Sequence, residues 1–188
     1  IEDISCVPVF GLIEGLAKMI TQTRVGVLAT TATIKSSAYR RQIQKCRPGA
    51  LVFQQACPAF VPLIESGDLE TDNIYSYARD YLKPLIEANV EAIVLGCSHF
   101  PLLIPVLKRI LPNNVRLIDP AIGLASNLDQ FLGPPRFSLS KSLRPEIFKK
   151  TRFCVTSEPS DFLVKTQFCL GCCPNVELIS LRSKALSF

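Results

Sequence analysis

AIVLGCSHFPLLIPVLKRIL, residues 92–111, joins two patterns of hydrophobicity that together decide the fold. Its first four residues are all apolar, which is typical of a strand buried on both faces of a parallel sheet. From Leu102 to Leu111 the apolar residues recur in steps of three and four, which predicts an amphipathic helix. A buried strand that leads through Gly96 into such a helix is the repeating unit of α/β proteins.

The same alternation of apolar runs and helical spacing continues on both sides of this stretch. Residues 74–86 again place apolar side chains at steps of three and four. We therefore predict an α/β fold with parallel sheets and helices on both faces. The predicted strands are residues 7–12, 25–29, 50–54, 92–95, 115–118, 153–156 and 176–181.

The composition of the chain fits a soluble globular protein. It has 188 residues, of which 48% are hydrophobic, and its formal net charge is +5. No apolar run approaches the roughly 20 residues that span a bilayer, and the start shows no export signal, so no membrane association is expected. The eight cysteines are therefore interpreted as reduced thiols of a cytoplasmic protein. Because the sequence starts at Ile1 without a Met, we expect a fragment or a processed chain.

Residues 133–152 are predicted to form a basic loop. They combine Pro and Ser with six basic residues and a single acid, Glu146. A solvated linker is favoured over a phosphate or nucleic-acid site, because no nucleic-acid motif accompanies these charges. The tail that follows holds only a strand, a helix and a strand. We expect this tail to pack on a sheet that another part of a protein supplies.

The strongest candidate for chemistry is Cys97-Ser98-His99, which follows the predicted strand 92–95. Ligands of open α/β sheets bind at this end of the strands. Backbone N–H groups at the start of the next helix would stabilise a Cys97 thiolate, so Cys97 is a candidate nucleophile or proton-transfer base. His99, the only histidine, would donate to a substrate carboxylate or control the protonation of the thiol. The alternative is a buried structural cysteine beside a helix-capping Ser98.

Two further strand ends carry candidate site residues. Thr30 and Thr33 stand where strand 25–29 meets a helix, and their hydroxyls would hold a carboxylate, with simple helix capping as the alternative. After the next strand, Cys57 is predicted to be a buried, inert thiol. Glu65 is either a surface charge or the partner of a nearby cation.

The cysteines near the C-terminus do not predict a metal site. Cys169 and Cys172 form one Cys-x-x-Cys pair, but the sequence offers no second pair and no histidine nearby. A zinc-binding structural module is therefore kept only as an alternative.

Three motifs in a fixed order resemble those of the glutamate racemase family. They are ATTATIKS at residues 29–36, ACPAFVPLIE at residues 56–65 and LGCSHFPLL at residues 95–103. Their order and spacing match the family over residues 5–130, and the tail matches more loosely through its strand-helix-strand pattern. The resemblance therefore covers most of the chain.

The resemblance implies an enzyme of two pseudo-symmetric, flavodoxin-like domains that enclose glutamate between two cysteines. One thiolate would remove the α-proton and the opposite thiol would deliver a proton to the other face, with no metal or other cofactor. The D-glutamate would serve bacterial peptidoglycan synthesis, and with it the cell wall and cell shape. Residues 8–118 would be a nearly complete second domain, and residues 119–188 a tail that returns to an incomplete first domain.

By the same resemblance, Cys97 would be the acid or base that acts on L-glutamate. His99 and Glu65 would assist this proton transfer. The side chains that would bind the substrate are Ser98, His99, Thr30 and Thr33.

The sequence departs from the family pattern in two ways. Ser98 and Phe100 replace the usual Thr and Tyr, which keeps a hydroxyl at the substrate position. The family's front motifs, Asp-Ser-Gly, Pro-Tyr-Gly and Cys-Asn-Thr, have no counterpart here, so we expect this chain to be inactive alone.

Other functions are left open by the sequence. An aspartate or hydantoin racemase of the same superfamily is one alternative, and a non-catalytic amino-acid-binding relic is another. The expected partner is a small-molecule substrate, with no nucleic acid and no membrane. A homodimer is kept as a candidate assembly.

Overall fold

The chain divides into two compact units, Ile1–Pro135 and Arg136–Phe188, and each is described by itself. The computed structural model describes residues 8–67, 69–133, 151–170 and 173–180, without the side chains of residues 17–18 and 167–170. None of the helices in these ranges is long and apolar enough to cross a membrane.

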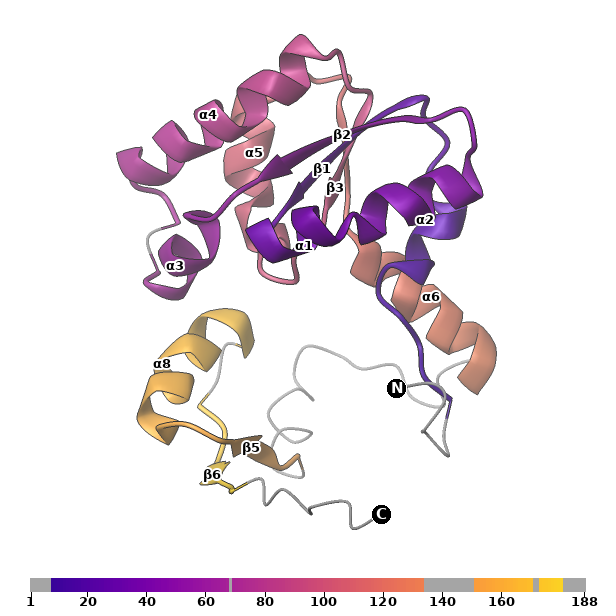
Figure 1. Ribbon diagram of the computed structural model, residues 1–188. Coiled ribbons are helices and arrows are strands. Elements are labelled where there is room, and N and C mark those ends of the chain that lie inside the picture. The colour runs from indigo at the N-terminus through magenta and orange to yellow at the C-terminus, as the bar shows by residue number, and fades with distance from the viewer. Residues whose placement is uncertain (1–7, 68, 134–150, 171–172, 181–188) are drawn as a thin grey trace, which may run out of the picture. The chain divides into compact units, whose positions relative to one another are not determined.

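The first unit is built on a parallel sheet of four strands (Figure 1). The strand order is β2-β1-β3-β4, so β1 lies between β2 and β3. This order is that of flavodoxin-like sheets, in which the chain leaves the central strand toward both edges. The α/β fold class predicted from the sequence is confirmed. The strands are β1 (Arg24–Ala29), β2 (Leu51–Ala56), β3 (Ala92–Leu95) and β4 (Arg116–Ile118).

Helices cover both faces of this sheet, as Figure 1 shows. The predicted helical spacing in residues 74–86 corresponds to α4, and that in residues 102–111 to η3 and α5. The helical elements are η2 (Glu14–Lys18), α1 (Thr31–Ser36), α2 (Ala38–Cys46), α3 (Phe60–Glu65), α4 (Asp72–Glu87), η3 (Phe100–Leu103), α5 (Ile104–Ile110) and α6 (Pro120–Leu132).

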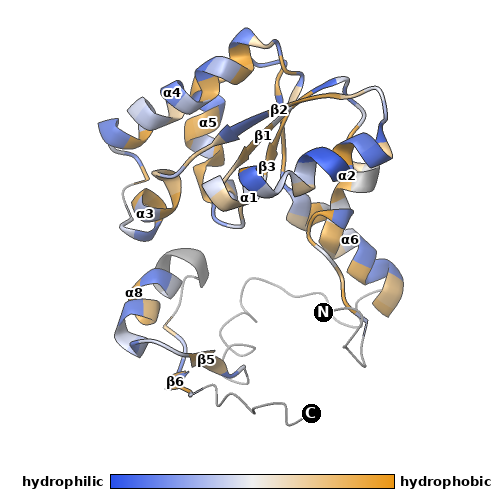
Figure 2. Ribbon diagram, viewed as in Figure 1, coloured by the Kyte–Doolittle hydropathy of each residue, from blue (hydrophilic) through white to orange (hydrophobic). Residues whose placement is uncertain are grey.

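The alternation of side chains along the strands separates two cores. Val25 and Val27 of β1 pack on one face with Tyr39 and Ile43 of α2. On the opposite face Leu28 of β1 packs with the apolar sides of α3, α4, η3 and α5. All four residues of β3 are buried, as expected for a strand covered on both faces. Figure 2 accordingly shows β1 and β3 as hydrophobic and the edge strand β2 as partly hydrophilic.

A network of polar contacts joins the amino ends of β1 and β3. The Glu91 carboxylate accepts from the backbone N–H groups of Thr23 and Arg24, each at 2.8 Å. The Arg24 guanidinium donates to the carbonyl of Ala88 through Nε at 2.8 Å and Nη2 at 2.6 Å. It also lies over the Phe53 ring, 4.9 Å from its centroid. These contacts align the starts of β1 and β3 with the end of α4.

The predicted strand at residues 7–12 is wrong for residues 8–12, and Val7 lies outside the described residues. Residues 8–12 form an irregular segment and a turn that lead into η2. Pro8 has no N–H to give to a strand ladder. The chain instead approaches α6, where the backbones of Gly15 and Gly123 meet without side chains between them.

The second unit contains a parallel pair of strands, β5 (Phe153–Val155) and β6 (Val176–Leu178), joined through α8 (Pro159–Leu170). These strands confirm the prediction at residues 153–156 and that at residues 176–180, each over fewer residues, while Leu181 lies outside the described residues. Arg152 and Glu177 form an exposed ion pair at 2.6 Å across them. Of the predicted basic loop 133–152, residues 134–150 lie outside the described residues.

Replacing Gly123 by Ala should destabilise the first unit by about 1–3 kcal/mol, the usual cost of an overpacked contact. A Cβ there would overlap the carbonyl group of Gly15, and a Cβ at Gly15 would lie 2.5 Å from the backbone N of Leu124. The higher helix propensity of Ala is too small to offset a clash with backbone atoms. Urea denaturation followed by circular dichroism measures the change.

Gly49→Ala is the matched control, because no atom lies within 4 Å of the Cβ it would add. Its unfolding midpoint should stay equal to that of the wild type or rise slightly, since Ala reduces the freedom of the unfolded chain. Identical midpoints for Gly123→Ala and Gly49→Ala would contradict the close packing of η2 on α6.

Candidate active site

The candidate site lies where β1 and β3 end side by side. Leu28 of β1 is in register with Leu95 of β3, and the N–H of Gly96 donates to the carbonyl of Leu28 at 2.7 Å. The connections after these two strands diverge to opposite edges of the sheet, which makes this the switch point where open α/β sheets bind ligands. Thr30 and Cys97 therefore emerge at neighbouring strand ends.

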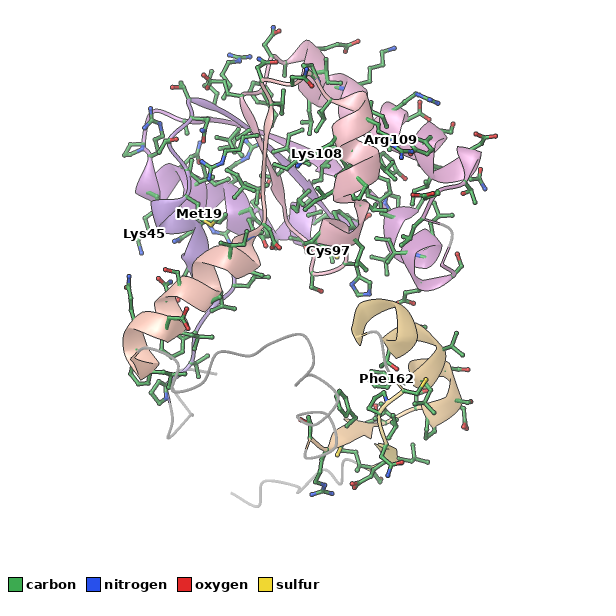
Figure 3. All side chains as sticks on the ribbon, turned by 180° about the vertical axis from the view of Figure 1, so that it is seen from behind. Met19, Lys45, Cys97, Lys108, Arg109 and Phe162 are labelled. Carbon is green, nitrogen blue, oxygen red and sulfur yellow. The ribbon has the colours of Figure 1, made fainter. Side chains whose placement is uncertain are left out.

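Cys97, His99 and Glu65 form a series of contacts at this edge. Nδ1 of His99 lies 4.0 Å from Sγ of Cys97, and Nε2 of the same ring lies 3.3 Å from Oε1 of Glu65. Glu65 is the last residue of α3, and Cys97 lies in the loop after β3. The thiol is partly exposed, as are the imidazole at 33% and the carboxylate at 31%. Figure 3 shows Cys97 toward one end of the η3–α5 segment and Arg109 toward the other.

This series allows proton transfer between the thiol and the imidazole. When Nε2 carries the hydrogen and donates it to Glu65, Nδ1 is left as an acceptor that faces Cys97. The thiol can then pass its proton to Nδ1, and the carboxylate of Glu65 stabilises the imidazolium that results. Glu65 thus contacts the imidazole of His99, and its role as the partner of a cationic group stays a prediction.

Ser98 is exposed, and its hydroxyl lies 3.4 Å from Nδ1 of His99. It does not cap the helix that follows: the N-cap of η3 is His99, and no side chain accepts there. The α-helix proper begins only at Ile104, after the 3-10 turn Phe100–Leu103. The element that starts after Cys97 is therefore a 3-10 turn and not the α-helix expected to stabilise its thiolate.

Thr30 and Thr33 stand together at the end of β1. The hydroxyl of Thr30 accepts from the N–H of Thr33 at 3.4 Å, and the two hydroxyl oxygens lie 2.9 Å apart. The helix-capping role considered for Thr30 is thus present. Both side chains are partly exposed, so the hydroxyls can also face a ligand. Their role as a carboxylate cradle stays a prediction.

Cys57 differs from Cys97 in its surroundings. It is fully buried, and its Sγ donates to the carbonyl of Gln55 at 3.6 Å. Burial raises the pKa of the Cys57 thiol well above its ordinary range, and a hydrogen bond with the backbone of Ala29 only partly offsets this. The predicted burial of Cys57 is confirmed. With its raised pKa the thiol stays protonated near neutral pH.

Two groups near Cys97 were missed by the sequence reasoning. Burial raises the pKa of Tyr39 to about 12, and the negative charges at Cys97 and Asp119 add to this effect. Asp119 directly follows β4 and caps α6, where its carboxylate accepts from Ala121 N–H at 2.9 Å. The rule that polar residues after a strand face the site would have found Asp119. Tyr39 lies on the buried face of α2, and the sequence pattern does not distinguish it there from an ordinary core residue.

Within the described ranges no three His, Cys, Asp or Glu side chains come together as they would around a metal ion. Cys154 and Cys173 are exposed free thiols. Cys172 and the side chain of Cys169 lie outside the described residues, so the alternative zinc site falls there.

Comparison with known proteins relates these features to one family. Residues 1–127 match the family model described as Asp/Glu/Hydantoin racemase. The glutamate racemase of Synechococcus sp. strain CC9605 is 52% identical over 171 residues, which are 91% of this chain and 64% of that protein. The glutamate racemase of Prochlorococcus marinus strain NATL2A is 41% identical over 95% of this chain and 66% of its own length. The chain thus spans slightly under two thirds of the length of these relatives.

Solved structures give the same result. Glutamate racemase from Francisella tularensis subsp. tularensis SCHU S4, in complex with D-glutamate, superposes with a TM-score of 0.80 at 31% identity, over 97% of this chain and 67% of that one. Glutamate racemase from Thermus thermophilus, in complex with beta-chloro-D-alanine, gives 0.76 at 31% identity, over 96% of this chain and 65% of that one.

The free energy of unfolding should fall as the pH rises from 10 toward 12. Unfolded Tyr39 loses its proton near pH 10.0, while folded Tyr39 keeps it to about pH 12. Its contribution is thus complete below pH 10.0 and lost as the pH rises through about 12. For a side chain that is 2% exposed this difference is worth about 2–3 kcal/mol.

Tyr39→Phe removes this contribution, so its unfolding free energy should decline less steeply over the same interval. Urea denaturation of both proteins at several alkaline pH values measures the difference, and all other titrating groups are common to both. Tyr77→Phe, which changes a ring that is 41% exposed, is the control. Parallel declines in wild type and Tyr39→Phe would refute the prediction.

Proposed function

Because this chain belongs to the Asp/Glu/hydantoin racemase family, we propose that it provides Cys97 as one of the two acid–base groups of a glutamate racemase. The observation that carries the proposal is the series Cys97–His99–Glu65 at the carboxyl end of β3. Such a series equips a thiol to act as a base toward a carbon acid and as an acid in the reverse direction. Glutamate is preferred over aspartate or a hydantoin because the Synechococcus and Prochlorococcus relatives, 52% and 41% identical, are glutamate racemases.

The proposed reaction starts with a Cys97 thiolate, formed when the thiol passes its proton to Nδ1 of His99. The thiolate removes the α-proton of L-glutamate, so an S–H bond forms and the C–H electron pair stays on the α-carbon. An acid on the opposite face then delivers a proton to this carbon, and D-glutamate results. The reverse reaction uses the same two groups in exchanged roles.

Substrate binding is proposed for the hydroxyls around Cys97. Thr30 and Thr33 project from the neighbouring strand end, and Ser98 is exposed beside the thiol. Hydroxyls can donate to a substrate carboxylate or accept from its ammonium group, so this set suits both polar groups of an amino acid. Held in this way, the α-carbon of L-glutamate would face Sγ of Cys97.

The second acid–base group must approach from the other face of the α-carbon. Among the described residues, Cys97 is the partly exposed thiol at the carboxyl edge of the β1–β4 sheet, while Cys57 is buried there. We propose that the partner group belongs to the portion of a full racemase that corresponds to the unmatched third of the relatives. With that portion, the product would be cytoplasmic D-glutamate for peptidoglycan.

A joined protein tests the proposal. This chain is fused to the segment of the Synechococcus relative that lies outside the aligned region, and exchange of the α-proton of L-glutamate is followed by proton NMR in deuterated water. Cys97→Ala should reduce the exchange by about a thousandfold or more, the scale of a lost acid–base group. Cys57→Ala, the matched control, should stay within about threefold because that thiol is buried and protonated.

The same assay with L-aspartate and with a hydantoin decides the substrate class, since the proposal requires faster exchange of L-glutamate. Equal losses in Cys97→Ala and Cys57→Ala would sink the assignment of Cys97. Binding of glutamate without any exchange in the folded wild-type fusion would favour the alternative of a non-catalytic binding protein.

A further inference from the structure

The short helix α3 is held at its start by a residue of another helix. Ala59, the N-cap residue of α3, offers no side chain that could cap it. Its own N–H donates to the hydroxyl of Tyr81, on α4, at 3.3 Å. The end of the loop after β2 is thereby fixed to α4 before α3 begins.

The same tyrosine also starts a series of aromatic contacts. The Tyr81 ring lies edge-on to Phe60, with centroids 5.1 Å apart and planes at 82°. Phe60 in turn lies edge-on to Phe100, at 5.2 Å and 86°. Phe60 and Phe100 are both fully buried. Such edge-to-face pairs have a preferred geometry, so they fix orientation as well as distance.

This series connects Tyr81 to the candidate active site. Phe60 is the first residue of α3 and Glu65 the last, so the position of Phe60 determines where the Glu65 carboxylate lies. Phe100 directly follows His99 at the start of η3. We propose that Tyr81 is a positioning residue that sets the contact between Glu65 and His99, and through it the protonation of Cys97.

The hydroxyl of Tyr81 is suited to this role because it stays neutral. Burial raises its pKa, so the oxygen accepts from Ala59 N–H as a phenol. Without the hydroxyl, the half-buried N–H of Ala59 loses this hydrogen bond. An unpaired buried N–H is unfavourable, so the chain before α3 is expected to shift until this group reaches water. A displacement there moves α3 as a rigid turn, and the 3.3 Å contact of Glu65 with His99 lengthens.

The sequence supplies a direct probe for this contact. His99 is the only histidine, so its ring ¹⁵N signals are unambiguous, and their shifts report which nitrogen carries the hydrogen. The spectra of wild type and Glu65→Gln define the two limits, with and without the carboxylate. In Tyr81→Phe the signals should move from the wild-type positions toward those of Glu65→Gln.

Tyr77→Phe is the matched control. Tyr77 stands one turn earlier on α4 and is stacked on Tyr81 with centroids 6.0 Å apart, yet it is 41% exposed. Its variant should keep the wild-type imidazole signals. Phe60→Leu, which keeps the Tyr81 hydroxyl but removes the ring between Tyr81 and Phe100, should move the signals in the same direction as Tyr81→Phe. Wild-type signals in both Tyr81→Phe and Phe60→Leu would overturn the inference.

The kinetic part of the inference rests on the proposed function. In the joined protein, Tyr81→Phe should lower kcat for α-proton exchange by about tenfold with KM within about twofold, because a misplaced acid–base group affects the chemical step more than binding. An unchanged kcat would overturn this part. No exchange in the wild-type fusion would instead refute the proposed function, while the imidazole spectra still decide the role of Tyr81.

Discussion

The close approach of β1 and β3 is the constraint on which the first unit depends. Gly96 donates to the carbonyl of Leu28 at 2.7 Å, and a Cβ on Gly96 would lie 3.0 Å from that same oxygen, from Cβ of Ala29 and from Cε2 of Tyr39. Contacts of 3.0 Å are tighter than most real Cβ contacts, so a larger residue would push the strand ends apart. Glycine allows β3 to end directly beside β1, and Cys97 therefore emerges next to the hydroxyls that follow β1.

The same arrangement gives two thiols opposite properties. Cys57 follows the edge strand β2, and its N–H donates to the carbonyl of Ala29 at 2.9 Å, which draws the loop inward and buries the side chain. Cys97 follows the internal strand β3, but the loop turns outward into η3 and leaves Sγ partly exposed next to an imidazole. Position along the sheet therefore does not decide whether a thiol is exposed. The direction of the loop that follows the strand does.

Hydrophobic spacing was sufficient to predict the strands of the sheet and its two helical layers, because those features depend on burial that each segment shows by itself. It failed at residues 8–12, where the chain forms no strand and Phe10 meets Phe131 of α6 with ring centroids 5.1 Å apart. The candidate site could be predicted only where a residue type suited to chemistry directly follows a strand, as Cys97 and Thr30 do. Tyr39 and Tyr81 could not be found in this way, since their roles arise from contacts between separate helices and strand ends.

The departure at Phe100 from the usual tyrosine can be understood from packing. Phe100 is fully buried and meets Phe60 edge-on at 5.2 Å. A phenol at this position would bring a hydroxyl that needs a hydrogen-bond partner, whereas phenylalanine fills the same space with no polar group to satisfy. At Ser98 the opposite holds, because that side chain is exposed and its hydroxyl reaches His99. The buried position thus carries no hydroxyl, and the exposed position carries one that reaches His99. The contacts that orient His99 are compatible with both.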